Sequence, residues 1–292
     1  MVFENIPPYV FALTSAFLFA FGGQMQFIGV STVDLRSGTM VSITTAAVIY
    51  WSLSPFLLDG AHWTQPAVLI FVLAGLFRPS VSANLSVAGI RHLGPTLAST
   101  LSATNPIFGT TLGVLVLGET MTWPIAIGTG GVILAIILLS KKDTRVPATW
   151  PLWALSLPIG AAAVRSFAHV LSKIGMEDIP DPYFVGLVGF SVSAIVTILN
   201  QSMRKKSVAV QWRNKGLFWF VAAGFSFSAA VICLNTALLR GELVTVVPII
   251  AAAPIFSMLL SIIVFRREKL TARIVIAVFM VVPSVAYIAI NR

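Results

Sequence analysis

Two arginines lie inside long apolar segments of this sequence, whereas all ten acidic residues lie outside such segments. Arg78 is in the middle of one segment and Arg165 lies within another. A guanidinium keeps its charge at physiological pH, and placing it at the centre of a bilayer costs about 2.5–3.5 kcal/mol on translocon-insertion scales. Because these segments hold no acidic partner, we expect both arginines to line an electropositive cavity that binds anions.

Basic side chains continue along the helix that carries the second arginine. Arg165, His169 and Lys173 are spaced i, i+4, i+8 and therefore share one helical face. His169 either faces a ligand as the only intramembrane group that titrates near neutral pH, or hydrogen-bonds a neighbouring backbone. We expect Lys173 to extend toward the membrane interface, because its long apolar stem allows it to do so.

Prolines mark the points where the predicted helices should bend. Pro79 directly follows Arg78, and a proline inside a helix leaves one backbone carbonyl without its donor. A bent helix that carries a charge is either a binding element or a fixed structural element whose arginine binds carbonyls of neighbouring helices. We predict hinges at Pro79, Pro106 and Pro254.

Side-chain amides complete the predicted site. Amides within membrane helices bind polar substrates, but they also join helices and then contribute roughly 1 kcal/mol or less each. The sequence predicts a substrate-binding set of Gln24, Arg78, Asn84, Asn105, Arg165, His169 and Asn235.

These residues are positioned by helices that composition assigns to a membrane. The chain is 57% hydrophobic and 10% charged, and its mean hydropathy is +0.94. Its apolar segments are too long for membrane β-strands and do not alternate polar with apolar residues. We predict an all-α polytopic membrane protein with ten transmembrane helices, near residues 9–29, 39–58, 66–90, 96–117, 123–140, 150–174, 183–203, 216–238, 243–265 and 272–290.

The sequence also repeats itself. A polar stretch at 141–151 separates two halves, predicted as residues 1–143 and 144–292. Pro106-Ile107-Phe108 in the fourth predicted helix matches Pro254-Ile255-Phe256 in the ninth, and Glu119 and Glu268 follow at similar intervals. Five helices is an odd number, so the second half enters the membrane from the opposite side. The repeats are therefore predicted to be inverted around a site near the midplane.

Asn105-Pro106 through Leu117-Gly118-Glu119-Thr120 resembles the end of the fourth helix in the drug/metabolite transporter superfamily, in its ten-helix EamA-type form. Pro254 through Arg267-Glu268 is a degenerate counterpart. The resemblance implies two five-helix EamA-like repeats around a central cavity, with the fifth and tenth helices at the periphery. It also implies efflux and cytoplasmic termini. The chain departs from the family at Ala20-Phe21-Gly22-Gly23, where relatives often carry Trp-Gly, and in the absence of glycines from its tenth helix.

The net charge of +9 comes mainly from loops that the ten-helix arrangement places on one side of the membrane. The positive-inside rule puts that side in the cytoplasm and both termini outside, unlike the resemblance. The expected location is a bacterial inner membrane. The basic residues of this side are Arg36, Arg91, Lys141, Lys142, Arg145, Arg204, Lys205, Lys206, Arg213, Lys215, Arg266, Arg267, Lys269 and Arg273.

The sequence predicts a transporter rather than an enzyme. It has no GxxxxGK[ST] loop, no cluster with metal-ligand spacing and no hydrolytic triad. We predict a secondary-active or facilitative transporter of a small anionic or zwitterionic metabolite, such as an amino acid or organic acid, working by alternating access without a cofactor.

The expected partners are this substrate and membrane lipid but no nucleic acid, and the chain is a monomer or a homodimer. The alternatives are an exporter of lipophilic cations, a lipid flippase and a non-transporting scaffold.

Overall fold

The computed structural model describes residues 6–140, 151–202, 214–266 and 271–290. Within these residues, seven helical segments are long and apolar enough to cross a membrane, and three shorter apolar helices complete the ten spans expected from the sequence. The fold is all-helical, and the protein is a multi-pass membrane protein. The helices are α1 (Pro8–Gly29), α2 (Leu35–Leu57), η1 (Gly60–Thr64), α3 (Ala67–Gly75), η2 (Leu76–Val81), α4 (Ser82–Ser102), α5 (Asn105–Leu117), α6 (Trp123–Ser140), η3 (Leu152–Leu155), α7 (Ser156–Asp178), α8 (Pro182–Ser202), α9 (Gly216–Arg240), α10 (Leu243–Ile250), α11 (Ala253–Ile263) and α12 (Ala272–Ile290).

The two ends of the helical bundle carry opposite charge, and we call them the acidic end and the basic end. Asp59, Glu119, Asp181 and Glu242 lie in the connections at the acidic end, and Glu177 and Asp178 lie in the last turn of α7, at the same end as the basic Lys173 and Arg240. Arg36, Lys215 and Arg266 lie at the basic end, together with Asp34. The Nδ2 of Asn214 donates to the Thr32 carbonyl at 2.8 Å, which joins two connections at the basic end. The other basic clusters expected there, around Lys141, Arg204 and Lys269, fall outside the described residues.

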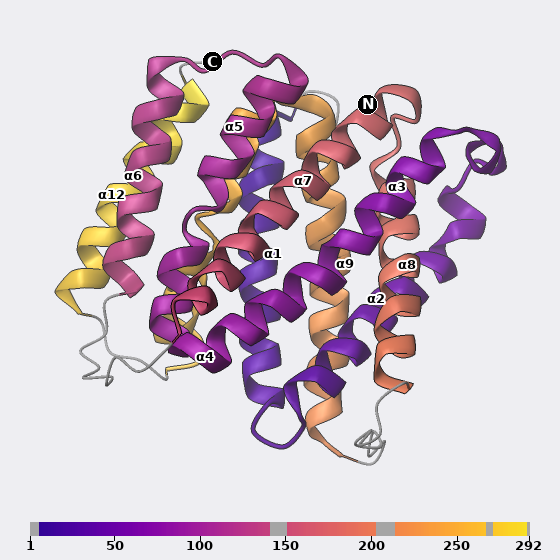
Figure 1. Ribbon diagram of the computed structural model, residues 1–292, viewed down its shortest axis with the longest axis horizontal. Helices are drawn as coiled ribbons and strands as arrows, with labels where there is room; N and C mark the ends of the chain where they lie inside the picture. The colour runs from indigo at the N-terminus through magenta and orange to yellow at the C-terminus, as the bar shows by residue number, and fades with distance from the viewer. Residues whose placement is uncertain (1–5, 141–150, 203–213, 267–270, 291–292) are drawn as a thin grey trace.

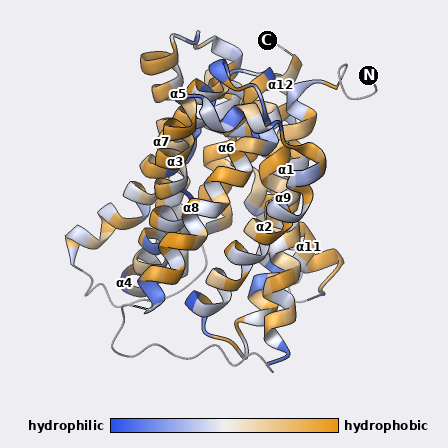
Figure 2. Cartoon of the chain, turned by 90° about the vertical axis from the view of Figure 1, so that its right-hand side faces the viewer, coloured by the Kyte–Doolittle hydropathy of each residue, from blue (hydrophilic) through white to orange (hydrophobic). Residues whose placement is uncertain are grey.

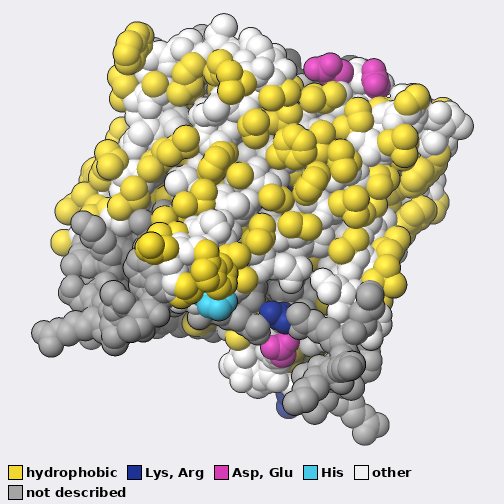
Figure 3. Space-filling model, in the orientation of Figure 1, with side chains coloured by type: hydrophobic (Ala, Val, Ile, Leu, Met, Phe, Trp, Pro, Cys, Tyr) yellow, Lys and Arg dark blue, Asp and Glu magenta, His cyan; other side chains and the backbone are white. Residues whose placement is uncertain are grey.

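Hydrophobic side chains cover the bundle between these ends (Figures 2 and 3), as a bilayer requires. In Figure 3 acidic side chains are visible at the upper end, whereas the lower end shows one acidic side chain beside basic ones. The first helix begins and the last helix ends at the acidic end (Figure 1), which agrees with an even number of spans.

The repeats are inverted, as the odd number of helices per half predicts. Helix α1 begins at the acidic end, where Pro8 lies against Gly241. Helix α7, its counterpart in the second half, ends at that same end, where Lys173 binds the Gly241 carbonyl. Equivalent helices of the two halves thus run in opposite directions through the membrane.

The first helix of each half packs mainly against the other half. Helix α1 runs antiparallel along α9, where Ser15 donates to the Ala230 carbonyl and Ser226 donates to the Leu18 carbonyl, at 2.8 and 2.7 Å. A Cβ on Gly29 would lie 3.0 Å from the Gly216 carbonyl oxygen, so the small residue permits this close approach. Helix α7 packs against α3, α4 and α5 of the first half. The halves are therefore interlocked.

The fourth and ninth spans share one interruption. Helix α4 ends at Ser102 and α5 begins at Asn105, whereas α10 ends at Ile250 and α11 begins at Ala253. Pro106 and Pro254 each lie in the first turn of the helix that follows the break, where a missing N–H costs little. The matching Pro-Ile-Phe stretches therefore mark matching positions in the backbone.

Helices α6 and α12 form a pair at one edge of the bundle (Figure 1), in agreement with the peripheral position expected for the fifth and tenth spans. Gly128 and Gly131 face Ile288 and Ser284 of α12, close enough that added Cβ atoms would clash with them. These glycines form the packing surface between the two helices. The inner side of α6 nevertheless reaches the centre of the bundle through Ile136 and Leu139.

Candidate functional site

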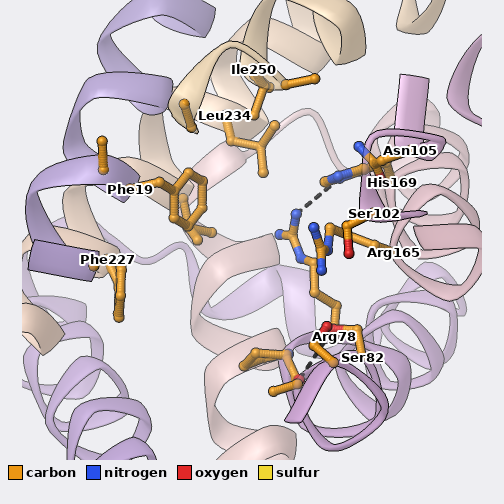
Figure 4. Close-up of a pocket in the computed structure, with 18 of the residues that line it drawn as sticks. Phe19, Arg78, Ser82, Ser102, Asn105, Arg165, His169, Phe227, Leu234 and Ile250 are labelled. Atoms are coloured by element: carbon orange, nitrogen blue, oxygen red, sulfur yellow. Dashed lines mark hydrogen bonds between the residues drawn. The ribbon is translucent and has the colours of Figure 1, made fainter. Parts of the chain in front are cut away.

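A cavity of about 770 Å³ occupies the centre of the bundle, between the interlocked halves. Its walls come from most of the spans (Figure 4), and two of the walls differ sharply in character. The residues of the polar wall are Arg78, Ser82, Ser102, Asn105, Arg165 and His169. We call this set the arginine wall.

Arg78 reaches the cavity from a break in the third span. The residue has non-helical dihedral angles, φ −133° and ψ 131°, within the π-helical turn η2. The break frees backbone carbonyls, and the Ser193 hydroxyl of α8 lies 2.7 Å from the Gly75 oxygen and 3.1 Å from the Arg78 oxygen. The bend predicted from Pro79 is thus present, and a serine of the neighbouring helix satisfies its exposed carbonyls.

The Arg78 side chain binds His169 across the cavity wall. Its Nη1 donates to the His169 Nδ1 at 2.9 Å (Figure 4). A guanidinium has only donors, so Nδ1 is the acceptor and the imidazole is the neutral form with its proton on Nε2. Because His169 is buried, its ring is held by the surrounding helices, and its hydrogen bond holds the guanidinium in position. The contact of His169 in the structure is thus with the Arg78 side chain and not with a neighbouring backbone group.

Arg165 lies beside Arg78 on the same wall (Figure 4). Within the described part of the chain it has no carboxylate partner and no hydrogen-bond acceptor. The next residue, Ser166, donates to the Asn105 carbonyl at 3.1 Å, which fixes α7 against α5 and so sets the position of Arg165. Two half-buried guanidinium groups thus face one cavity, one held by a histidine and one with its donors available to a ligand.

The predicted binding residues divide into two groups. Arg78, Asn105, Arg165 and His169 line the cavity together. Gln24, Asn84 and Asn235 are not among the residues that line it, and each hydrogen-bonds the backbone instead. Gln24 donates to Ser257, Asn84 to the Ser80 carbonyl and Asn235 to the Pro182 carbonyl, at 2.8, 2.9 and 3.1 Å. Gln24 and Asn235 thereby join separate spans, the alternative role weighed for such amides.

Two of the three predicted hinge prolines line the cavity and one does not. Pro79 and Pro254 line the cavity, whereas Pro106 is buried in the first turn of α5 and is not among the lining residues. All three lie at or beside a break in a span, but their movement stays a prediction.

Lys173, the last member of the basic stripe, belongs to a different site. Its Nζ lies 2.9 Å from Oε1 of Glu119, and the two oxygens of Glu119 accept hydrogen bonds from the backbone N–H groups of Leu243 and Val244, both at 2.8 Å. A carboxylate at the start of α10 satisfies free N–H groups and interacts favourably with the helix dipole. Glu119 was expected only to mark the repeat, and the structure shows it as a cap that ties the first half to the second at the acidic end.

The wall opposite the arginines is apolar and was not predicted. Phe19 of α1 faces the cavity beside Phe227 and Leu234 of α9 and Ile250 of α10 (Figure 4). We call these four residues the apolar wall. In the sequence they are indistinguishable from the many other aromatic and aliphatic residues of the spans, because their orientation depends on how the helices pack. Ser82 and Ser102 were missed for a similar reason, since membrane helices commonly contain serine.

The cavity extends toward the basic end. In α2 it is lined by Thr39, Ser42 and Ile43, all in the first turns after Arg36, and in α6 by Leu139, near the end of that helix. At the acidic end, buried residues such as Phe184, Leu238 and Leu243 fill the bundle. The structure therefore has its cavity displaced toward the basic end and closed at the acidic end.

Comparison with known proteins agrees with this arrangement. The model of the EamA-like transporter family matches residues 6–141 and 152–290. Among solved structures, a chain titled "Crystal structure of protein" is similar with a TM-score of 0.82 and 16% sequence identity, over 96% of this chain and 95% of that chain. At that identity the likeness concerns the fold alone. A search of curated proteins found no match.

Proposed function

The chain belongs to the EamA-like transporter family, and on that basis we propose that it carries a small organic anion or zwitterion through the central cavity. The observation behind this proposal is the arginine wall, where Arg78 and Arg165 lie side by side (Figure 4). No described residue that lines the cavity is an aspartate or glutamate. A guanidinium forms bidentate hydrogen bonds with carboxylate, phosphate or sulfonate oxygens, so two of them form a binding site for one such group.

Electrostatics favour an anion over a cation. The two guanidinium charges lie in a medium of low dielectric constant, where like charges repel more strongly than in water. An anion bound between them relieves this repulsion, whereas a permanent cation would add to it. A lipophilic cation exporter, the main alternative, needs an acidic group in the pathway, and none is present among the described lining residues.

Transport would proceed by alternating access between the two ends. The inverted halves meet at the cavity, and the breaks near Arg78, Pro106 and Pro254 are positions where a span can bend. In this scheme the structure represents the state that receives substrate from the basic end. Opening the acidic end then requires the Glu119 cap to separate from α10 or to move together with it. The positive-inside rule makes the basic end cytoplasmic. With termini at the acidic end, outside the cell, the cycle is export across a bacterial inner membrane.

Counterflow into proteoliposomes tests the anion proposal. A panel of labelled anions, amino acids and permanent cations is offered to vesicles preloaded with the same unlabelled compound. We expect at least one anion or zwitterion to be exchanged, and we expect Arg78→Ala and Arg165→Ala to lower its flux. The exposed Lys215→Ala variant at the basic end is the matched control that removes a positive charge outside the cavity.

The proposal is overturned if a permanent cation is exchanged in preference to every anion and both arginine variants leave that exchange unchanged. It is also overturned if the folded protein exchanges no member of the panel. A reporter fused after Arg292 tests the orientation separately, because reporter activity in the cytoplasm would contradict external termini.

A further inference from the structure

The cavity is asymmetric, and its asymmetry narrows the substrate class. Resting on the proposed function, we infer that the substrate is an amphipathic organic monoanion without an amino group. Its anionic group binds Arg78 and Arg165, and its apolar body lies against Phe19, Phe227, Leu234 and Ile250. This geometry favours such a substrate over simple amino acids and small dianions.

Among the described residues, the charged side chains of the cavity all belong to the arginine wall. Arg78, Arg165 and His169 come from two spans only, the broken third span and α7. Asn105 and Ser102 surround them and offer neutral hydrogen-bonding groups. Because the two guanidinium groups lie together, they bind one anionic group rather than two separated ones.

The apolar wall lies across the cavity from the arginines. Phe227, Val231 and Leu234 are spaced i, i+4, i+7 along α9, so they lie on one face of that helix and line the cavity together. The rings of Phe19 and Phe227 are packed with centroids 6.0 Å apart. Ile250 and Met258 extend this surface toward α11. An apolar body is stabilised on such a surface in proportion to the area that it removes from water.

An amino group has no carboxylate partner among the described residues that line this cavity. The ten acidic residues of the chain include Glu4, Asp143 and Glu268, which lie outside the described residues, and none of the other seven lines the cavity. The ammonium group of an amino acid lies about two bonds from its carboxylate, so binding at the arginines would bring it close to two like charges. Without a carboxylate partner, this repulsion is not compensated.

The volume also fits an amphipathic molecule. A cavity of about 770 Å³ lies within the range of roughly 300–1,000 Å³ for small-molecule sites. A small dianion would leave the apolar wall in contact with water, and its second charge would lie against that wall without a partner.

Counterflow with labelled sulfonates tests the inference. Sulfonates remain ionised at all working pH values and so do not leak through the bilayer as neutral acids. The probes are hexane-1-sulfonate, methanesulfonate, which lacks the apolar body, 2-aminoethanesulfonate, which adds an amino group, and butane-1,4-disulfonate, which adds a charge. We expect hexane-1-sulfonate to be exchanged with the lowest KM of the four, and its exchange to need Arg78 and Arg165.

Variants of the apolar wall separate the two contributions. Phe227→Ala is expected to raise the KM for hexane-1-sulfonate by about tenfold, because truncating a side chain in an apolar pocket has effects of this size. Phe227→Leu keeps an apolar contact and should have a smaller effect. Residual exchange of methanesulfonate should be the same in both variants and the parent protein.

Each result decides between the inference and the proposal on which it rests. Exchange of 2-aminoethanesulfonate, methanesulfonate or the disulfonate with a KM equal to or below that of hexane-1-sulfonate overturns the amphipathic monoanion while leaving an anion transporter in place. A KM for hexane-1-sulfonate that Phe227→Ala does not change also overturns it. Absence of hexane-1-sulfonate exchange overturns the inference. Absence of exchange for all four sulfonates, together with exchange of a permanent cation offered in the same assay, overturns the proposed function itself.

Discussion

The third spans of the two halves are equivalent in the repeat but differ at the membrane centre. In the first half the span is broken at Arg78 and continues as α4, whereas in the second half α9 is unbroken from Gly216 to Arg240. Aligning the two Pro-Ile-Phe stretches pairs Arg78 with Ser226, whose hydroxyl binds the Leu18 carbonyl and joins α9 to α1. One position therefore faces the cavity in one half and joins helices in the other.

The first spans of the halves show the same contrast. The alignment pairs Arg165 with Phe17 and His169 with Phe21. Phe17 is 41% exposed and its ring packs on Phe21 and Phe256. The repeat thus provides a nearly symmetric scaffold, and substitutions at a few equivalent positions make the cavity charged on one side only.

Replacing Arg78 by the residue of its counterpart should have the largest effect. We expect Arg78→Ser to lower anion counterflow by about a hundredfold or more, since loss of a charge-assisted, buried contact costs about 3 kcal/mol or more. Counterflow of the transported anion measures this, and monodisperse elution in detergent checks the fold. The reciprocal Ser226→Ala variant removes only a helix-joining hydroxyl and should keep most of the flux. Equal losses in the two variants would contradict the assignment of different roles.

Replacing Arg165 by the residue at the equivalent position tests the second arginine. We expect Arg165→Phe to lower counterflow by about tenfold to a hundredfold, because Arg78 remains to bind the anion. Arg165→Lys should restore part of the flux, because it returns the charge without the planar donors. The KM for the anion should carry most of the change. Unaltered KM values in Arg165→Phe would show that Arg165 does not contact the substrate.

The cap at the acidic end gives a stability test of the interlocked halves. Glu119→Ala should lower the free energy of unfolding by about 1–3 kcal/mol, because it leaves the N–H groups of Leu243 and Val244 without their acceptor and removes the carboxylate partner of Lys173. Thermal unfolding in detergent measures the loss. Glu177→Ala, an exposed acid at the same end, is the control. A melting temperature that falls equally in both variants would contradict a specific cap.

The smallest expected effect concerns His169, which positions Arg78 rather than carrying charge. We expect His169→Ala to raise the KM several-fold, since the guanidinium loses a neutral acceptor worth about 1–2 kcal/mol. His169→Asn offers an amide oxygen near the place of Nδ1 and should recover part of the loss. If His169→Asn is as impaired as His169→Ala, the hydrogen bond to Arg78 does not explain the role of His169.

The charged side of the site could be predicted from the sequence because its signals are local. An arginine in an apolar segment has few acceptable environments, and Pro79 next to Arg78 identifies the break. The inverted repeat followed from counting helices and from the matching Pro-Ile-Phe stretches.

The apolar side and the cap could not be predicted, because they depend on long-range packing. Phe19 and Phe227 meet across helices that are far apart in sequence, and nothing in the segments distinguishes them from phenylalanines that face lipid, such as Phe218 and Phe279. Glu119 binds N–H groups more than a hundred residues away. Gln24 and Asn235 were assigned to the site because a buried amide at a helix junction and an amide in a cavity look alike in sequence.

The packing of the first helix of each half against the other half has a consequence for biosynthesis. Helix α1 hydrogen-bonds and packs mainly with α9, which the ribosome completes about two hundred residues later. Until then Ser15 and Gly29 of α1 lack the α9 residues that they contact in the folded protein. Helix α7, in contrast, emerges after its partners α3, α4 and α5 are in place. Helices α1 and α6 of the first half therefore complete their packing only after α9 and α12 of the second half have been synthesised.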